Sequence, residues 1–117
     1  MDENMALDRL LLAVIRKDDY DETVYQLNTH GFFVTRLSSS GGFLKKENVT
    51  LMLGVNAERL EEAVEILKTF AGRRRSQTYV MPTPGGGNVY AGHGVPVEVD
   101  MGGVTLFTLK LDGFQKL

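Results

Sequence analysis

The architecture of this chain is clearest in residues 35–54, Thr-Arg-Leu-Ser-Ser-Ser-Gly-Gly-Phe-Leu-Lys-Lys-Glu-Asn-Val-Thr-Leu-Met-Leu-Gly. The pattern predicts a strand, a glycine-bearing loop and a second strand. Ser38–Ser40 supply hydroxyls, and Gly41 and Gly42 let backbone amides approach an anion without a Cβ in the way. Phe43 adds a flat apolar face. Two interpretations fit: contacts for a ligand that carries phosphate and a base, or a hairpin turn followed by a core aromatic.

Length and composition narrow the class of protein. A chain of 117 residues suits a single domain, expected over 7–117, with 1–6 as a disordered leader or an expression remnant. Its 13 basic and 15 acidic residues leave a net charge of −2, which gives no reason to expect a nucleic-acid polymer as partner. The absence of cysteine excludes disulfides and thiolate chemistry. No apolar run approaches the roughly 20 residues of a membrane span, so we expect a cytoplasmic protein.

Hydrophobic periodicity predicts two helices among five strands. The first helix follows Asp18 or Asp19 as N-cap and stops at Gly31, and the second runs from an Asn56 cap to Gly72. The segment 73–94 holds two prolines and five glycines, so no regular structure is expected there. The predicted strands cover residues 7–15, 32–37, 48–55, 95–101 and 104–111.

The order β-α-β-β-α-β-β predicts an α+β, ferredoxin-like fold with an additional C-terminal strand. Residues 95–101 and 104–111 are expected to form a closing hairpin with its turn at Gly102-Gly103. Both helices should cover one face of a four-stranded antiparallel sheet. Apolar residues occur on both alternations of the strands, so the other face is expected to be buried against further copies of the chain.

Catalytic and metal-binding patterns are weak in this sequence. His30 and His93 lie far apart, and no HxH or HxxxH spacing is present. Ser38–Ser40 lack a base partner nearby in the sequence, and Gly85-Gly-Gly-Asn88 lacks the Lys-Ser/Thr ending of a P-loop. Arg73–Arg75 complement the end of the second helix, or contact a phosphate or an acidic partner. We therefore predict no catalytic residues and no resident metal, with an enzyme that uses His93 as the least favoured alternative.

Two groups of positions carry a resemblance to a known family. The first group is Thr35, Leu37, Ser39, Gly41-Gly42-Phe43-Leu44, Asn48, Thr50-Leu51 and Gly54-Val55. After a Pro/Gly-rich loop, the second group is Pro96-Val-Glu-Val, the run from Gly102 to Phe107, and Asp112-x-Phe114. Through these positions the sequence resembles, over residues 7–117, the PII-like cyclic-di-AMP receptor family of the DarA/PstA type.

The resemblance implies a homotrimer that holds cyclic di-AMP in clefts between neighbouring subunits, acts without catalysis and signals to a protein partner. It also implies a short T-loop, at about residues 38–47, and a longer B-loop, at about residues 73–95. The ligand-binding residues that it implies are Thr35, Gly41, Gly42, Phe43, Leu44, Asn48, Gly54 and Phe107.

Four positions depart from the family pattern. Glu47 stands where a glycine is usual before the asparagine, Gly31 and Phe33 replace polar side chains, and Lys116 displaces a glutamine of the tail. These changes bear on ligand identity, so a PII-like sensor of ATP or another adenine nucleotide remains an alternative. A metal-handling ferredoxin-like trimer is the other.

Overall fold

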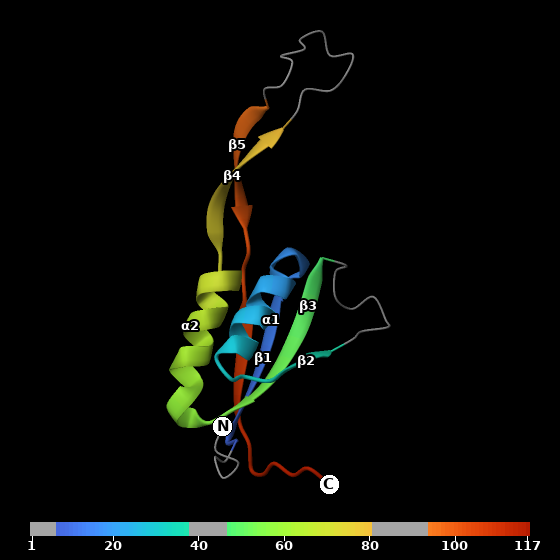
Figure 1. Cartoon of the computed structure of the whole chain (residues 1–117), viewed down its shortest axis with the longest axis vertical. Helices are drawn as coiled ribbons and strands as arrows, with labels where there is room; N and C mark the ends of the chain where they lie inside the picture. Colours follow the sequence, from blue (N-terminus) through green and yellow to red (C-terminus); the bar gives the residue numbers. More distant parts are fainter. Residues whose placement is uncertain (1–6, 38–46, 81–93) are drawn as a thin grey trace.

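The computed structural model describes residues 7–37, 47–80 and 94–117. It is a mixed α+β structure in which two helices lie on the same face of an antiparallel sheet, and a two-stranded ribbon extends beyond one end of helix α2 (Figure 1). The expected leader, residues 1–6, lies outside the described residues, as do 38–46 and 81–93.

The main sheet has four antiparallel strands in the order β2-β3-β1-β6. Helix α1 connects β1 to β2 and helix α2 leads from β3 toward β6, so each connection passes over one strand. This arrangement is compatible with the ferredoxin-like fold that the sequence predicts. The strands are β1 (Arg9–Arg16), β2 (Val34–Leu37), β3 (Asn48–Val55) and β6 (Thr105–Lys110), and the helices are α1 (Tyr20–Thr29) and α2 (Leu60–Ala71).

The core lies between the sheet and the two helices. Alternate residues of β1 and β3 point toward the helices and are fully buried, as the period-2 geometry of a strand requires. The apolar stripe of α2 faces them at helical spacing. The buried hydrophobic residues are Leu11, Ala13, Ile15, Leu27, Phe32, Val49, Leu51, Leu53, Val55, Ala63, Ile66, Leu67 and Ala71.

The helices begin and end close to the predicted residues, but the start of α1 lacks the side-chain cap that the sequence predicts. The Asn56 side chain accepts from the Glu58 backbone N–H at 2.9 Å, at a short 3-10 turn, η2 (Ala57–Arg59), that leads into α2. Gly72 follows that helix, and Gly31 follows α1 with φ of +85°. Asp19 occupies the N-cap position of α1, as predicted, but its side chain makes no capping hydrogen bond. Asp18 and Asp19 belong to the 3-10 turn η1 (Lys17–Asp19), and the Asp19 carboxylate binds an arginine instead.

The segment after α2 contains regular structure that the sequence analysis missed. Strand β4 (Arg74–Val80) pairs antiparallel with β5 (Val95–Met101) in a two-stranded ribbon. The prediction that residues 73–94 lack regular structure is therefore wrong for the residues of β4. Most of β4 is exposed and its first half is polar, so its sequence lacks the alternation of buried and exposed residues that indicates a strand. The B-loop as expected, at about 73–95, thus includes a strand and the first residue of another.

The predicted closing hairpin is also wrong, because β5 pairs with β4 whereas β6 pairs with β1. Gly102 and Gly103 have φ of +76° and +124°, and they join the ribbon to the main sheet rather than closing a hairpin. A Cβ on Gly102 would lie 2.2 Å from the Gly72 carbonyl oxygen, so only glycine fits. The additional strands are therefore inserted between α2 and β6 rather than appended at the C-terminus.

A partly buried ion pair anchors this ribbon to the body of the protein. Arg74 Nη2 donates to Asp19 Oδ1 at 2.5 Å, and Arg74 Nη1 donates to the Gly72 carbonyl oxygen at 3.0 Å. The Asp19 side chain is only 8% exposed. Its hydrogen bond with Arg74 raises the pKa of the guanidinium above its ordinary value, so Arg74 stays charged throughout the physiological range.

Replacing Arg74 should destabilise the fold more than replacing its neighbour Arg75. Arg74→Met leaves the buried Asp19 carboxylate unpaired, at a cost of about 1–2 kcal/mol, moderated because Arg74 is 37% exposed. Arg75 pairs with Glu98 and Asp100 where all three side chains are well exposed, so Arg75→Met should cost about 0.5 kcal/mol or less. Urea unfolding at one fixed protein concentration measures both. Equal losses would contradict an anchoring role for Arg74.

Candidate ligand-binding surface

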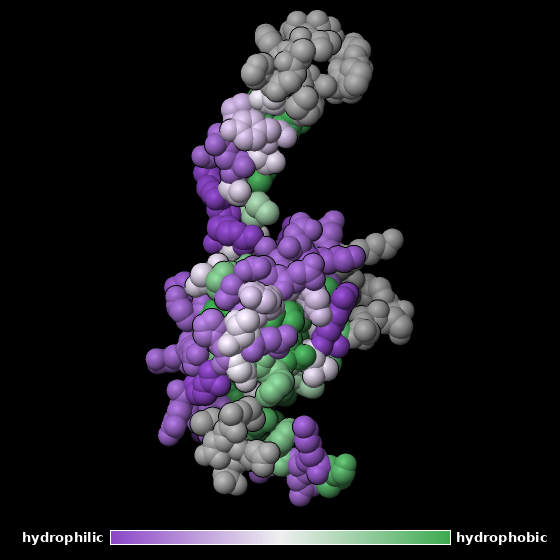
Figure 2. All heavy atoms as spheres, in the orientation of Figure 1, coloured by the Kyte–Doolittle hydropathy of each residue, from purple (hydrophilic) through white to green (hydrophobic). Residues whose placement is uncertain are grey.

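The face of the main sheet that carries no helix is a partly apolar surface, which we call the open face. It is formed by the strand residues that alternate with the buried ones. Figure 2 shows the opposite, helix-bearing side of the molecule, where hydrophilic side chains predominate over α2. The open face consists of Leu10, Leu12, Val14 and Arg16 on β1, Asn48, Thr50, Met52 and Gly54 on β3, Thr35 and Leu37 on β2, and Thr105, Phe107 and Leu109 on β6.

The strand register places four of the expected ligand residues on this open face. Thr35 lies opposite Met52 and therefore diagonal to Gly54. Asn48 precedes Met52 by four residues, about 13 Å along β3. Phe107 lies opposite Leu12. The structure thus brings Thr35 and Gly54 together, and it sets Asn48 and Phe107 apart from them.

Thr35 and Phe107 occupy opposite edges of the sheet. They belong to one row across the strands, Thr35–Met52–Leu12–Phe107, with β2 and β6 as the two outer strands. Three strand spacings separate them, about 14 Å. Phe107 is 54% exposed, so its ring is available to a partner or a ligand. Gly41, Gly42, Phe43 and Leu44 lie outside the described residues.

The missing side chain of Gly54 leaves space for the side chain of Leu7. A Cβ at this position would lie 3.0 Å from Leu7 Cδ1, so the Leu7 side chain lies against the glycine backbone. Phe33, one of the departures from the family pattern, precedes β2 and is 73% exposed. The Gly54 end of the open face is therefore bordered by apolar groups.

The Asn48 end of the open face is polar and charged, and sequence reasoning missed its main cation. Arg16, the last residue of β1, is the direct cross-strand partner of Asn48. An open hollow of about 460 Å³ beside them is lined by Arg16, Lys17, Asp18 and Glu47. The alternation of β1 could have placed Arg16 on the open face, but its pairing with Asn48 depends on the strand register.

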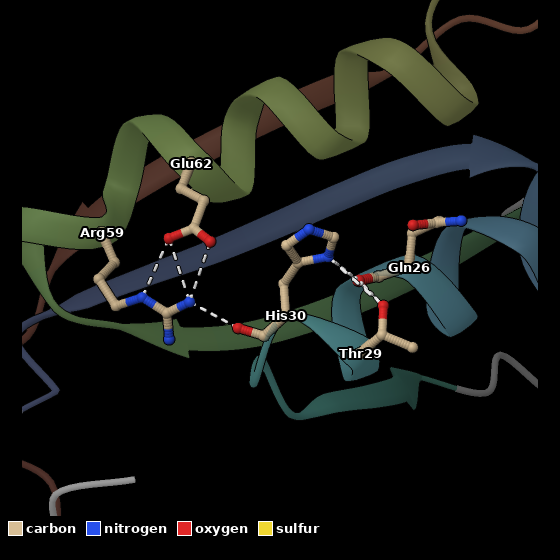
Figure 3. Close-up of polar contacts among 5 residues, drawn as sticks. All are labelled: Gln26, Thr29, His30, Arg59 and Glu62. Atoms are coloured by element: carbon tan, nitrogen blue, oxygen red, sulfur yellow. Dashed lines mark hydrogen bonds and ion pairs between the residues drawn. The ribbon is translucent and has the colours of Figure 1, made fainter.

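The polar cluster between the two helices has a structural role. Arg59 Nε and Nη2 donate to the Glu62 carboxylate, and Nη2 also donates to the His30 carbonyl oxygen at 2.5 Å (Figure 3). The Arg59 guanidinium also stacks on Phe32, 4.1 Å from the centroid of its ring. His30 Nδ1 lies 2.8 Å from the Gln26 carbonyl oxygen, which can only accept, so the ring caps the end of α1.

No group of three or more histidine, cysteine, aspartate or glutamate side chains within 7–37, 47–80 and 94–117 is arranged to hold a metal ion. Over the same part of the chain, no helix is long and apolar enough to cross a membrane.

The structure is a mixed α+β protein that is compatible with a ferredoxin-like fold and has a partly apolar open face on its main sheet. The chain belongs to the cyclic-di-AMP receptor family, whose model matches residues 8–117. A functionally unknown protein from Pediococcus pentosaceus ATCC 25745 has a similar crystal structure, with a TM-score of 0.72 and 30% sequence identity. The match covers 97% of this chain and 99% of that one.

Arg59→Met should lower the free energy of unfolding by about 1–2 kcal/mol, because it removes the stack on Phe32 and the hydrogen bond to His30. Lys68→Met, on the exposed side of α2, is the matched control and should change stability by about 0.5 kcal/mol or less. Urea unfolding compares the two. A stable Arg59→Met protein would show that this cluster does not hold the helices together.

Proposed function

We propose that this protein is a non-enzymatic cytoplasmic receptor that binds cyclic di-AMP between the subunits of a homotrimer. The observation that carries the proposal is the match of the cyclic-di-AMP receptor family to residues 8–117. Binding would rearrange the T-loop, at about 38–47, and the B-loop, now bounded by β4 and β5, and so change the surface presented to a protein partner.

The placement of the expected ligand residues supports a site between subunits. Thr35 and Phe107 lie at opposite edges of one open face, so a compact ligand cannot contact both within one subunit. In a cyclic assembly arranged so that the β2 edge of one subunit adjoins the β6 edge of the next, the two residues would reach the same ligand. The exposed apolar side chains of this face, such as Phe107 and Leu109, would become buried in the process.

The residue types suit a nucleotide with two phosphate groups. The Thr35 hydroxyl and the Asn48 amide can donate hydrogen bonds to phosphate or base, and Phe107 offers a ring face on which adenine can stack. A receptor that bound only ATP would use much of the same chemistry, and Glu47 beside Asn48 makes that comparison worth measuring.

The turn η1 offers a physical link between the two loops. The Lys17 backbone N–H donates to the Glu47 carbonyl oxygen at 2.6 Å, at the end of the T-loop, and Asp19 binds Arg74 at the root of the ribbon. A ligand that moved residues 47 and 48 would therefore act on the ribbon through η1, the three residues Lys17–Asp19. Such coupling requires only that the ligand bind one loop arrangement more tightly than the other.

Titration calorimetry with cyclic di-AMP, with ATP and with divalent metal ions tests the proposal. We expect micromolar or tighter binding of cyclic di-AMP, without a requirement for metal. Binding of ATP alone would replace the proposal with an adenine-nucleotide sensor, and binding of metal alone with a metal-handling trimer.

The protein should be a trimer in solution, because the open face is too apolar to remain exposed to water. Light scattering at micromolar concentration should give three times the 13.0 kDa subunit mass. Leu12→Lys, at the centre of the open face, should shift the mass toward the monomer, whereas Thr69→Lys, on the exposed side of α2, should leave it unchanged. A monomeric wild-type protein would contradict the proposed assembly.

Thr35→Ala and Asn48→Ala should each weaken cyclic-di-AMP binding by about 1–3 kcal/mol, the cost of a lost hydrogen bond to a charged or buried group. Neither variant should alter the trimer mass. Thr69→Ala on α2 is the matched control, and calorimetry provides the measurement. If both variants bind like the wild type, the ligand site lies elsewhere.

A further inference from the structure

Arg16 occupies the place beside Asn48 from which a cation would reach the same ligand. The two residues are direct partners in the antiparallel pairing of β1 and β3, the last residue of one strand and the first of the other. Side chains at directly opposed positions lie on the same face, with Cβ atoms about 4.5–5.5 Å apart. A group that accepts a hydrogen bond from Asn48 therefore lies within the range of the Arg16 guanidinium.

The Arg16 side chain is exposed and uncommitted. Within residues 7–37, 47–80 and 94–117, no hydrogen bond, ion pair or ring contact involves its guanidinium. The two other arginines of the main sheet are engaged, Arg9 with Asp8 and Arg36 over the Tyr20 ring at 5.0 Å. Arg16 thus has a free planar donor group, which can bind phosphate through two parallel hydrogen bonds.

Glu47 places a carboxylate in the same hollow as Arg16. The Glu47 carbonyl oxygen accepts the 2.6 Å hydrogen bond from the Lys17 backbone N–H, and Glu47 lines the same hollow as Arg16. The hollow contains two cations, Arg16 and Lys17, and two anions, Asp18 and Glu47. Without Arg16 the remaining charges would repel a phosphate group, so the arginine offsets the carboxylate that this chain carries next to Asn48.

We propose that Arg16 is a phosphate-binding residue of the nucleotide site, acting on the phosphate group nearest to Asn48 and offsetting the charge of Glu47. The assignment rests on the proposed function and extends it, since it names the residue that lets this chain accept a dianionic nucleotide despite an acidic neighbour.

Calorimetry with cyclic di-AMP on wild type, Arg16→Gln, Arg16→Lys and Glu47→Gln tests this assignment. Arg16→Gln should weaken binding about tenfold or more, the effect of losing a charge-assisted hydrogen bond. Arg16→Lys should lose less, because it keeps the charge and loses only the paired geometry. Glu47→Gln should strengthen binding several-fold. The gap between wild type and Arg16→Gln should narrow between about 0.05 and 0.3 M salt, as screening predicts.

Lys68→Gln is the matched control, because it removes one positive charge from the exposed side of α2, in the helix layer. It should bind like the wild type, and all variants should keep the wild-type mass by light scattering and the wild-type unfolding midpoint. Tight wild-type binding with an unchanged Arg16→Gln affinity would overturn the role of Arg16 and leave the proposed function intact. No binding of cyclic di-AMP by the wild type would overturn the proposed function and this assignment together.

Discussion

The packing of β1 between β3 and β6 is the constraint on which the rest of the structure depends. Its odd-numbered residues Leu11, Ala13 and Ile15 are completely buried beneath the helices. Because side chains alternate along a strand, its even-numbered residues must then lie on the open face. A shift by one residue would exchange the two sets, burying Arg16 and exposing the core, so the hydrophobic pattern of β1 sets the register of both neighbouring strands.

That register also distributes the chemistry of the open face. The centre of the face is apolar, around Leu12 and Met52, and the Asn48 end is polar and charged. The proposed ligand residues Thr35, Asn48 and Phe107 thus lie around an apolar centre rather than together in one pocket. Such a distribution suits a surface that is completed by a second copy of the chain, with the ligand at the margin.

The short turn η1 shows how few residues connect distant parts of the fold. It hydrogen-bonds to Glu47 on one side and supplies Asp19 to Arg74 on the other. A two-stranded ribbon such as β4–β5 is only marginally stable alone, so its position depends on contacts at its root. The backbone bond from the Gly103 N–H to the Ala71 carbonyl oxygen, 2.8 Å long, reinforces the same place.

Periodicity and local chemistry were enough to predict the two helices, the buried strands and most of the helix ends. The buried alternation of β3 and the Asn56 cap are local signals, readable without knowledge of the fold. Family resemblance supplied the rest of the expected site, and the match over residues 8–117 confirms the family. The structure does not describe Gly41, Gly42, Phe43 and Leu44, so the loop that suggested the ligand stays a prediction.

Only the tertiary structure decided which strands pair and which side chains meet. Strand β4 has little buried surface, so its sequence carries no alternating signal, and β5 could not be assigned to it from composition. Asp19 holds the N-cap position of α1, but the sequence does not reveal that Arg74, 55 residues later, binds its carboxylate. Arg16 and Asn48 are likewise distant in the sequence, and only the pairing of β1 with β3 makes them neighbours. Helix and strand patterns are local properties of the chain, whereas pairing depends on contacts between residues that only folding brings together.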